Sequence, residues 1–310
     1  MRIGINALYL LPGRVGGTEI YLRSILPALV LLSPSNEFVV FLNRETSSLL
    51  DTPTDSVIEV HCGVSAAFRP ARIVYEQTVL PVLARRYKVD VLLNAGFTAP
   101  LLCSTPLCPV PMVTAVHDLQ HKIHPEFFRR LDLPFWNLLV WAAVSRSSRI
   151  LTFSTKTSED LVRLYGVPAG RIAVAPHGVD PTLFDLNAHE RSAGRMLLAV
   201  STLHPHKNLD RLLEAFAVFH QRHPDYRLVL AGARGFAAMK LEQLRDRLNL
   251  RDSVTFTGWI PREELYSLYA SARGFIYPSL FEGFGMPVAE ALAAGIPTAC
   301  SAIEPLMGIA

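Results

Sequence analysis

The chain has little of what marks disulfide-rich or nucleic-acid-binding proteins. Its 310 residues include only four cysteines, Cys62, Cys103, Cys108 and Cys300, with no CxxC pair among them. We therefore expect reduced thiols in a cytoplasmic protein. The formal net charge of +3 is small, so a nucleic-acid partner is not expected.

Long hydrophobic runs are also missing. The most apolar stretch, Leu131 to Val144, is interrupted by Asp132, Pro134 and Asn137 and is too short to span a bilayer. The first residues, Met1 to Asn6, resemble a β-strand rather than a signal peptide. We therefore expect a soluble cytoplasmic protein, with peripheral contact at the inner face of the membrane left open.

The chain is instead rich in apolar residues, and they occur in a regular pattern. Half of its residues are apolar and 18% are charged, so it can form a sizeable core. Short apolar runs alternate with helical patterns, which is typical of βαβ units and parallel sheets. The expected strands after the first are 37–42, 89–94, 112–116, 149–153, 196–200, 227–231, 254–257 and 274–277.

The length fits two domains of ordinary size. A polar stretch at 185–194 has few apolar anchors and looks like a linker. We therefore predict an α/β protein with two consecutive Rossmann-like domains, residues 1–185 and 186–310.

Two glutamates near the end of the chain form the most informative motif. Glu282 precedes a glycine turn, and Glu290 follows the expected helix start at Pro287. We expect Glu290 in the first helical turn, where a carboxylate can accept hydrogen bonds from a ribose diol, and Glu282 on the loop, within reach of sugar hydroxyls. The alternative is a solvated loop glutamate and a second glutamate stabilised by the helix dipole.

Other candidates follow other strands. Lys207 comes after strand 196–200 and can offer a point charge to a diphosphate, although a solvated lysine is the simpler reading. Asn208 beside it is a plausible helix N-cap. Gly16 and Gly17 allow close approach of a ligand to the backbone, or simply a tight turn. They lack the GxGxxG spacing of a dinucleotide site.

A histidine ends the strand at 112–116. His117 could hydrogen-bond a sugar hydroxyl or stabilise charge at a reacting centre. His121 and His124 lie nearby, and structural histidines are the main alternative for both. No carboxylate or cysteine completes a ligand set, so we predict no metal site.

Together these motifs resemble glycosyltransferase family 4, the retaining GT-B transferases that use nucleotide-sugar donors. The matching segments are Gly16–Glu19, His117–Leu119, His177–Asp180, Lys207–Asn208, Gly258–Pro261 and Glu282–Glu290. The resemblance implies two Rossmann-like domains facing a cleft, with a nucleotide-diphosphate sugar as donor substrate and no cofactor.

The resemblance also implies roles for single residues. His117 and Glu282 would be catalytic, beside the transferred sugar. The donor-binding residues would be Gly16, Gly17, Lys207, Gly258, Phe284, Gly285 and Glu290. Among them, Lys207 would hold the diphosphate with backbone groups at Phe284 and Gly285, Glu290 would bind the ribose, and Gly258 would flank the nucleobase.

The implied function is metal-independent transfer of a hexose, mannose by subgroup resemblance, to a glycan or lipid-linked acceptor in polysaccharide biosynthesis. Arginines and a lysine in the first domain either steer the protein to an anionic membrane or are scattered solvated surface. They are Arg69, Arg72, Arg85, Arg86, Lys88, Arg129 and Arg130.

By comparison with the family the chain ends early, by roughly sixty to seventy residues, so an incomplete second domain is expected. This leaves open a non-catalytic nucleotide-sugar-binding or scaffold protein, or an inactive fragment. Another GT-B enzyme, such as a sugar-nucleotide epimerase, is a further alternative, although the two glutamates with Lys207 favour transfer.

Overall fold

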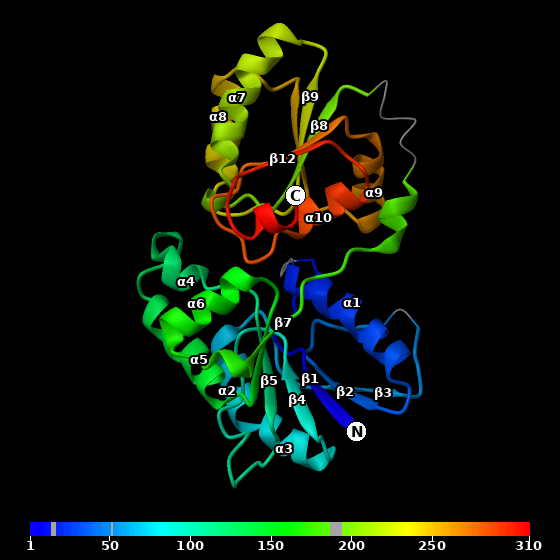
Figure 1. The fold of residues 1–310 in the computed structure, drawn as a ribbon, viewed down its shortest axis with the longest axis vertical. Helices are drawn as coiled ribbons and strands as arrows, with labels where there is room; N and C mark the ends of the chain where they lie inside the picture. The colour runs from blue at the N-terminus through cyan, green and yellow to red at the C-terminus, as the bar shows by residue number, and fades with distance from the viewer. Residues whose placement is uncertain (14–16, 51, 187–193) are drawn as a thin grey trace. The chain divides into compact units, whose positions relative to one another are not determined.

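The computed structural model describes residues 1–13, 17–50, 52–186 and 194–310. The chain divides into two compact units, Met1–Pro176 and His177–Ala310, each built on its own parallel sheet (Figure 1). We describe each unit by itself.

The first unit contains seven parallel strands in the order β3-β2-β1-β4-β5-β6-β7. The strands are β1 (Arg2–Asn6), β2 (Glu37–Leu42), β3 (Val57–His61), β4 (Val91–Asn94), β5 (Met112–Val116), β6 (Arg149–Thr152) and β7 (Ile172–Val174). Both faces of this sheet are covered, so its central strands are near-continuous apolar runs. In β2, for example, Phe38 to Leu42 are all fully buried.

Helices pack on both faces of this sheet (Figure 1). They are α1 (Gly17–Leu32), α2 (Arg69–Thr78), α3 (Leu80–Arg86), α4 (Gln120–Ile123), α5 (Leu133–Arg146) and α6 (Thr155–Tyr165). The chain moves outward from β1 to β2 in one direction and from β4 to β7 in the other. Because such crossovers are right-handed, α1 lies on one face while α5 and α6 lie on the other.

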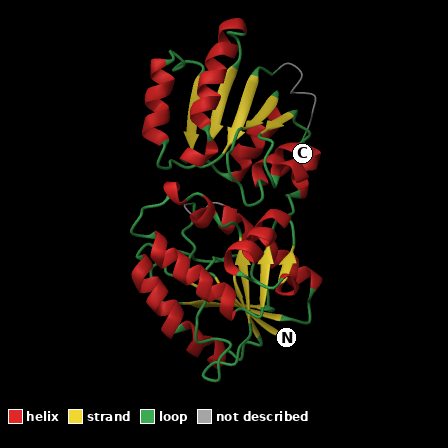
Figure 2. Cartoon of the chain, turned by 60° about the vertical axis from the view of Figure 1, so that its left-hand side comes forward, coloured by secondary structure: helices red, strands yellow, loops and turns green. Residues whose placement is uncertain are grey.

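The second unit contains five parallel strands in the order β10-β9-β8-β11-β12, seen as a layer between helices in Figure 2. They are β8 (Met196–Val200), β9 (Arg227–Ala231), β10 (Val254–Gly258), β11 (Gly274–Tyr277) and β12 (Thr298–Cys300). The helices are α7 (Leu209–Arg222), α8 (Ala238–Arg247), α9 (Arg262–Ser271) and α10 (Met286–Ala293). The predicted fold class, α/β with two Rossmann-like units, is confirmed.

Residues 177–185, which we assigned to the first domain from sequence, pack within the second unit. Leu183 is fully buried in one core cluster with Leu198, Phe275 and Val288. Most of the expected linker, residues 187–193, lies outside the described residues. In the described part of the chain, no helix has both the length and the apolar character needed to cross a bilayer.

Candidate functional site

The candidate residues of the second unit gather at the carboxyl ends of its strands. Lys207 follows β8, Gly258 ends β10, Glu282 follows β11, and Glu290 lies in α10. Open parallel sheets bind ligands at this edge, where loops lead from strands into helices. Because β8 pairs with β11, the loops of Lys207 and Glu282 start side by side.

Hydrogen bonds hold these two loops together. The carbonyl of His206 accepts from the Leu280 amide over 2.8 Å and from the Ser279 hydroxyl over 3.2 Å. Asn208 stands at the N-cap position of α7, but its side chain donates to the Pro278 carbonyl instead of capping the helix. Asn208 therefore lies at the predicted N-cap position, but its side chain joins the two loops rather than capping the helix.

Lys207 and Glu282 form an ion pair at this edge. Lys207 Nζ lies 2.6 Å from Glu282 Oε1 and donates a second hydrogen bond, 3.0 Å long, to the Tyr277 hydroxyl. The two charged side chains are only 14% and 10% exposed. Burial, and then the neighbouring charge of Glu282, raises the pKa of Tyr277 well above its ordinary value. Tyr277 is therefore a neutral hydroxyl between a cation and an anion.

The turn before α10 depends on a glycine. Gly285 has a φ of +109°, and a Cβ added there would lie 2.3 Å from Leu306 Cδ2. Only glycine suits this conformation and this contact. The ring of the preceding Phe284 meets the ring of His177 edge-on at 5.1 Å.

Glu290 lies beyond the first turn of α10, so our placement of it in that turn was wrong. It is buried, with 8% exposure, and the Tyr269 hydroxyl donates to its Oε2 over 2.8 Å. Burial raises the pKa of Glu290, and the hydrogen bond from Tyr269 offsets part of the rise. The helix dipole does not explain a buried carboxylate that a fully buried tyrosine holds in position.

Sequence reasoning missed the tyrosines. Tyr269 projects from α9, and its neighbour Tyr266 donates to Asp180 Oδ2 over 2.9 Å. Arg262 Nη1 lies 3.4 Å from the same Asp180 oxygen. Asp180 belongs to the His177–Asp180 motif, which was the available signal. No pattern in the sequence pointed to a tyrosine partner for Glu290.

Gly258 ends β10 at an irregularity in its pairing with β9. Its φ is +72°, its carbonyl accepts the Gly232 amide over 3.1 Å, and a Cβ added to it would meet nothing within 4 Å. Trp259, which follows, is 61% exposed. Glycine is therefore favoured at this position by its positive φ and not by close packing.

In the first unit, His117 follows β5 within an aromatic cluster. Its ring stacks on Phe153 at 4.6 Å and contacts Tyr21 of α1 edge-on at 5.4 Å. Burial lowers the pKa of His117 to about 4, so the ring is neutral at pH 7. Nε2 lies 2.9 Å from the Ala95 carbonyl, and a carbonyl only accepts. Nε2 therefore carries the proton, and Nδ1 is the acceptor nitrogen.

The other candidate residues of the first unit are Gly16, Gly17 and His121. Gly16 lies outside the described residues. Gly17 begins α1, and a Cβ added there would meet nothing within 4 Å. His121 is buried, and its Nε2 lies 2.7 Å from the Tyr165 hydroxyl. Among the described residues, no three His, Cys, Asp or Glu side chains are grouped to hold a metal ion.

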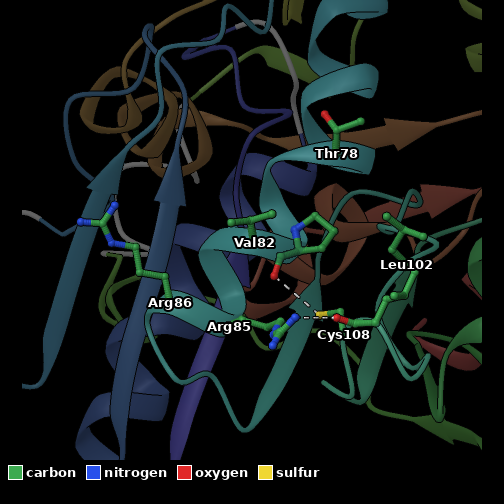
Figure 3. A pocket seen from close by; sticks show the side chains of 8 residues that line it. Thr78, Val82, Arg85, Arg86, Leu102 and Cys108 are labelled. Carbon is green, nitrogen blue, oxygen red and sulfur yellow. Dashed lines mark hydrogen bonds between the residues drawn. The ribbon is translucent and has the colours of Figure 1, made fainter.

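A surface hollow in the first unit does not include any of these residues. Thr78, Val82, Arg85, Leu102 and Cys108 lie around it (Figure 3). The Arg85 guanidinium donates to the Leu107 carbonyl over 2.9 Å. The candidate chemistry therefore lies elsewhere, at the strand ends.

Comparison with known proteins agrees with this geometry. The family model described as Glycosyltransferase Family 4 matches residues 15–183. The chain belongs to glycosyltransferase family 4. A second model, Glycosyl transferases group 1, matches residues 187–310 of this family 4 chain.

The family 4 chain is similar to two mannosyltransferases of O-antigen chains. It is 30% identical to O-antigen chain mannosyltransferase B of Escherichia coli, over 63% of this chain and 54% of that protein. It is also 30% identical to RfbU of Salmonella typhimurium, over 66% of this chain and 56% of that protein. The matches therefore span little more than half of these relatives.

Solved structures share the fold. Anabaena HepE, in complex with UDP and glucose, aligns with a TM-score of 0.71 at 20% identity, covering 99% of this chain and 82% of HepE. Sucrose-phosphate synthase of Thermosynechococcus elongatus aligns with a TM-score of 0.77 at 20% identity, covering 99% and 83%. At this identity the likeness shows the GT-B fold alone.

Proposed function

We propose that the chain is a retaining transferase that moves a hexose, mannose by preference, from a nucleotide-diphosphate sugar to a glycan or lipid-linked acceptor. The observation that carries this proposal is the buried Lys207–Glu282 pair at the same strand edge as Glu290. The two mannosyltransferase relatives support the sugar and the setting, polysaccharide biosynthesis.

Lys207 would neutralise charge on the leaving diphosphate. An ammonium group in a mostly buried setting stabilises a developing anion more strongly than one in water. In the present structure the Lys207 ammonium group is paired with the Glu282 carboxylate. A bound diphosphate would share the lysine, and the Glu282 carboxylate would then be available to hydroxyls of the donor sugar. This arrangement needs no metal ion.

Glu290 would bind the ribose of the nucleotide. Tyr269 holds its Oε2, so the orientation of the carboxylate is set before a ligand arrives. Preorganisation of this kind lowers the entropy lost on binding. Backbone groups at Phe284 and Gly285 would contact the diphosphate, Gly258 would border the nucleobase, and the glycines at 16 and 17 would border the donor phosphate.

The transfer step follows from these roles. The bond between the anomeric carbon and the diphosphate oxygen breaks, and the acceptor oxygen bonds to that carbon on the same face. The acceptor proton passes to the departing phosphate. His117 is a neutral ring in this account, so it contributes a hydrogen bond through Nδ1 rather than a positive charge.

We also propose a cytoplasmic protein that touches an anionic membrane carrying its acceptor. Exposed basic residues of the first unit, including Arg69, Arg129 and Arg130, support this contact. Arg72 does not belong with them. It is 6% exposed and interacts electrostatically with Glu76, so it is a buried structural residue.

Product analysis tests the proposal. The chain is incubated with GDP-mannose or UDP-glucose and an extract of lipid-linked glycans, and the anomeric configuration of the product is read by NMR. Retained configuration with release of the nucleoside diphosphate supports the proposal. Donor binding without product would favour the scaffold alternative, and sugar-nucleotide conversion without acceptor would favour an epimerase.

A further inference from the structure

The outer face of α5 is apolar although it is exposed. Leu131 just before the helix is 92% exposed, and Phe135, Leu138 and Trp141 are 47%, 57% and 53% exposed. Their spacing of three to four residues places them on one side of the helix. We call these four side chains the α5 outer face.

The inner face of α5 is also apolar. Val140, Ala143 and Val144 are buried, and Val140 and Val144 belong to a core cluster under the helix. The helix therefore has a complete core-facing side without its outer face. Core packing does not account for the outer leucine, phenylalanine and tryptophan, and a contiguous exposed apolar patch marks an interaction surface.

Positive charge predominates in the segment that carries the α5 outer face. Residues 129–146 contain Arg129, Arg130 and Arg146, all exposed, against a single acidic residue, Asp132. Arg69 of α2 adds a fourth exposed arginine, with its guanidinium carbon 4.9 Å from the ring centre of Trp136. A partner that suits this surface carries negative charge and accepts apolar side chains.

We propose that the α5 outer face docks on an anionic lipid bilayer. Tryptophan, phenylalanine and leucine enter the boundary between headgroups and acyl chains, and flanking arginines pair with phosphate headgroups. A helix of 14 residues is about 21 Å long, shorter than the hydrocarbon core, so it lies in the plane of the surface. A second copy of the chain suits the face less well, because its arginines would repel their counterparts.

The inference deepens the proposed function and rests on it for one point, that the acceptor is carried by a membrane. It assigns the membrane contact to one helix face instead of to basic residues scattered over the first unit. The docking itself depends on α5 and its arginines, whereas Lys207, Glu282 and Glu290 of the proposed donor site belong to the other unit. The two ideas can therefore fail separately.

Vesicle sedimentation tests the proposal on the full chain. Wild type is mixed with vesicles of phosphatidylcholine containing phosphatidylglycerol, and with phosphatidylcholine alone. We expect binding to the anionic vesicles that weakens at high salt. The double variant Leu138→Glu with Trp141→Glu should bind anionic vesicles with an affinity lower by about tenfold or more. The double variant Arg129→Ser with Arg130→Ser should show a similar loss.

A matched control lies on α1. Leu31 and Leu32 are 81% and 78% exposed, and α1 lies on the opposite face of the sheet. Leu31→Glu with Leu32→Glu should leave vesicle binding unchanged. All variants alter exposed side chains, so their thermal unfolding should match wild type.

Three results would overturn the docking surface. They are a wild type that ignores anionic vesicles, an α5 variant that binds like wild type, and a control variant that loses binding equally. Dimers of wild type that the α5 variants abolish, without vesicle binding, would assign the face to self-association instead. A GDP-mannose titration without vesicles reports separately on the proposed function, because the α5 variants should leave it unchanged.

Discussion

Lys207 Nζ lies 2.6 Å from Glu282 Oε1, although 75 positions separate the two residues in the chain. The contact joins the loop after β8 to the loop after β11, and Tyr277 at the end of β11 completes it. A mostly buried ion pair is weak evidence for stability, because desolvation offsets much of the attraction. Its position at the ligand-binding edge of the sheet favours a functional role.

The first prediction concerns the lysine of this pair. Lys207→Met should abolish measurable binding of a nucleoside diphosphate and should also destabilise the protein by about 1–3 kcal/mol, because it leaves the Glu282 carboxylate buried without its partner. Calorimetric titration with GDP and chemical denaturation measure the two effects.

A double variant separates these effects. Lys207→Met with Glu282→Gln removes both charges and should recover most of the lost stability while nucleotide binding stays absent. Recovery of binding in the double variant would show that Lys207 does not contact the diphosphate. Glu282→Ala alone should mainly lower turnover, since it removes the proposed positioning contact to the donor sugar.

The raised pKa of Glu290 gives a second prediction. The proposed ribose contact requires the carboxylate form, so nucleotide affinity should fall as pH decreases through this raised pKa. A folded-state pKa above the unfolded value stabilises the fold at low pH, and this contribution is lost as pH rises. Glu290→Gln should therefore unfold less readily than wild type near pH 7 yet bind nucleotide poorly.

Titrations and denaturation curves between pH 5 and 8 decide this point. Wild type and Glu290→Gln should converge in stability as the pH approaches 5. If Glu290→Gln is less stable than wild type at pH 7, burial of the Glu290 carboxylate does not destabilise the fold, and the prediction is wrong.

Tyr269 supplies a third prediction. Tyr269→Phe removes the hydroxyl that donates to Glu290 Oε2 and should cost about 1–3 kcal/mol of stability. Because the carboxylate loses its fixed orientation, nucleotide affinity should also fall, while Tyr266→Phe, which loses a bond to Asp180 instead, serves as the control. Equal affinity in Tyr269→Phe and wild type would show that Glu290 needs no positioning.

Two glycines form a matched pair for a fourth prediction. Both have positive φ, but alanine at 285 would place its Cβ 2.3 Å from Leu306 Cδ2, whereas alanine at 258 would meet nothing within 4 Å. Gly285→Ala should therefore destabilise the protein by about 2–4 kcal/mol and Gly258→Ala by about 1 kcal/mol. Thermal unfolding measures the difference, and similar losses in both would show that packing against Leu306 is unimportant.

His117 leads to a fifth prediction. Its pKa is lowered to about 4 by burial, so the unfolded chain binds its proton more readily at mildly acidic pH. The stability contributed by neutral His117 is present above about pH 6.5 and decreases towards pH 4. In denaturation series over this range, His117→Asn should show a shallower loss than wild type. An unchanged pH slope would place the histidine in contact with water.

Most of the fold was predictable from sequence. The strands 37–42, 112–116, 196–200, 227–231 and 274–277 were predicted at their observed bounds, because buried parallel strands are uninterrupted apolar runs. The strands β3, β7 and β12 were missed. They carry exposed or half-exposed residues and are edge strands of the two sheets, where the apolar pattern is weak.

The charged candidate residues could be named from the sequence, but the side chains that contact them could not. Motif spacing singled out Lys207, Glu282 and Glu290 as candidates, and the structure places Lys207 after β8, Glu282 after β11 and Glu290 in α10. Motif spacing could not show that Lys207 pairs with Glu282, or that Tyr269 meets Glu290 from another helix. Such contacts depend on how separate loops and helices pack, which no local pattern records.

The most direct test of the central claim is a calorimetric titration of wild type and Glu290→Ala with GDP-mannose and UDP-glucose in the absence of divalent metal. Wild type should bind one donor saturably, and Glu290→Ala should bind it more weakly by about 1–3 kcal/mol, or roughly 5- to 150-fold. Identical isotherms for the two proteins, or no binding of either donor by wild type, would contradict a nucleotide-sugar site at this strand edge.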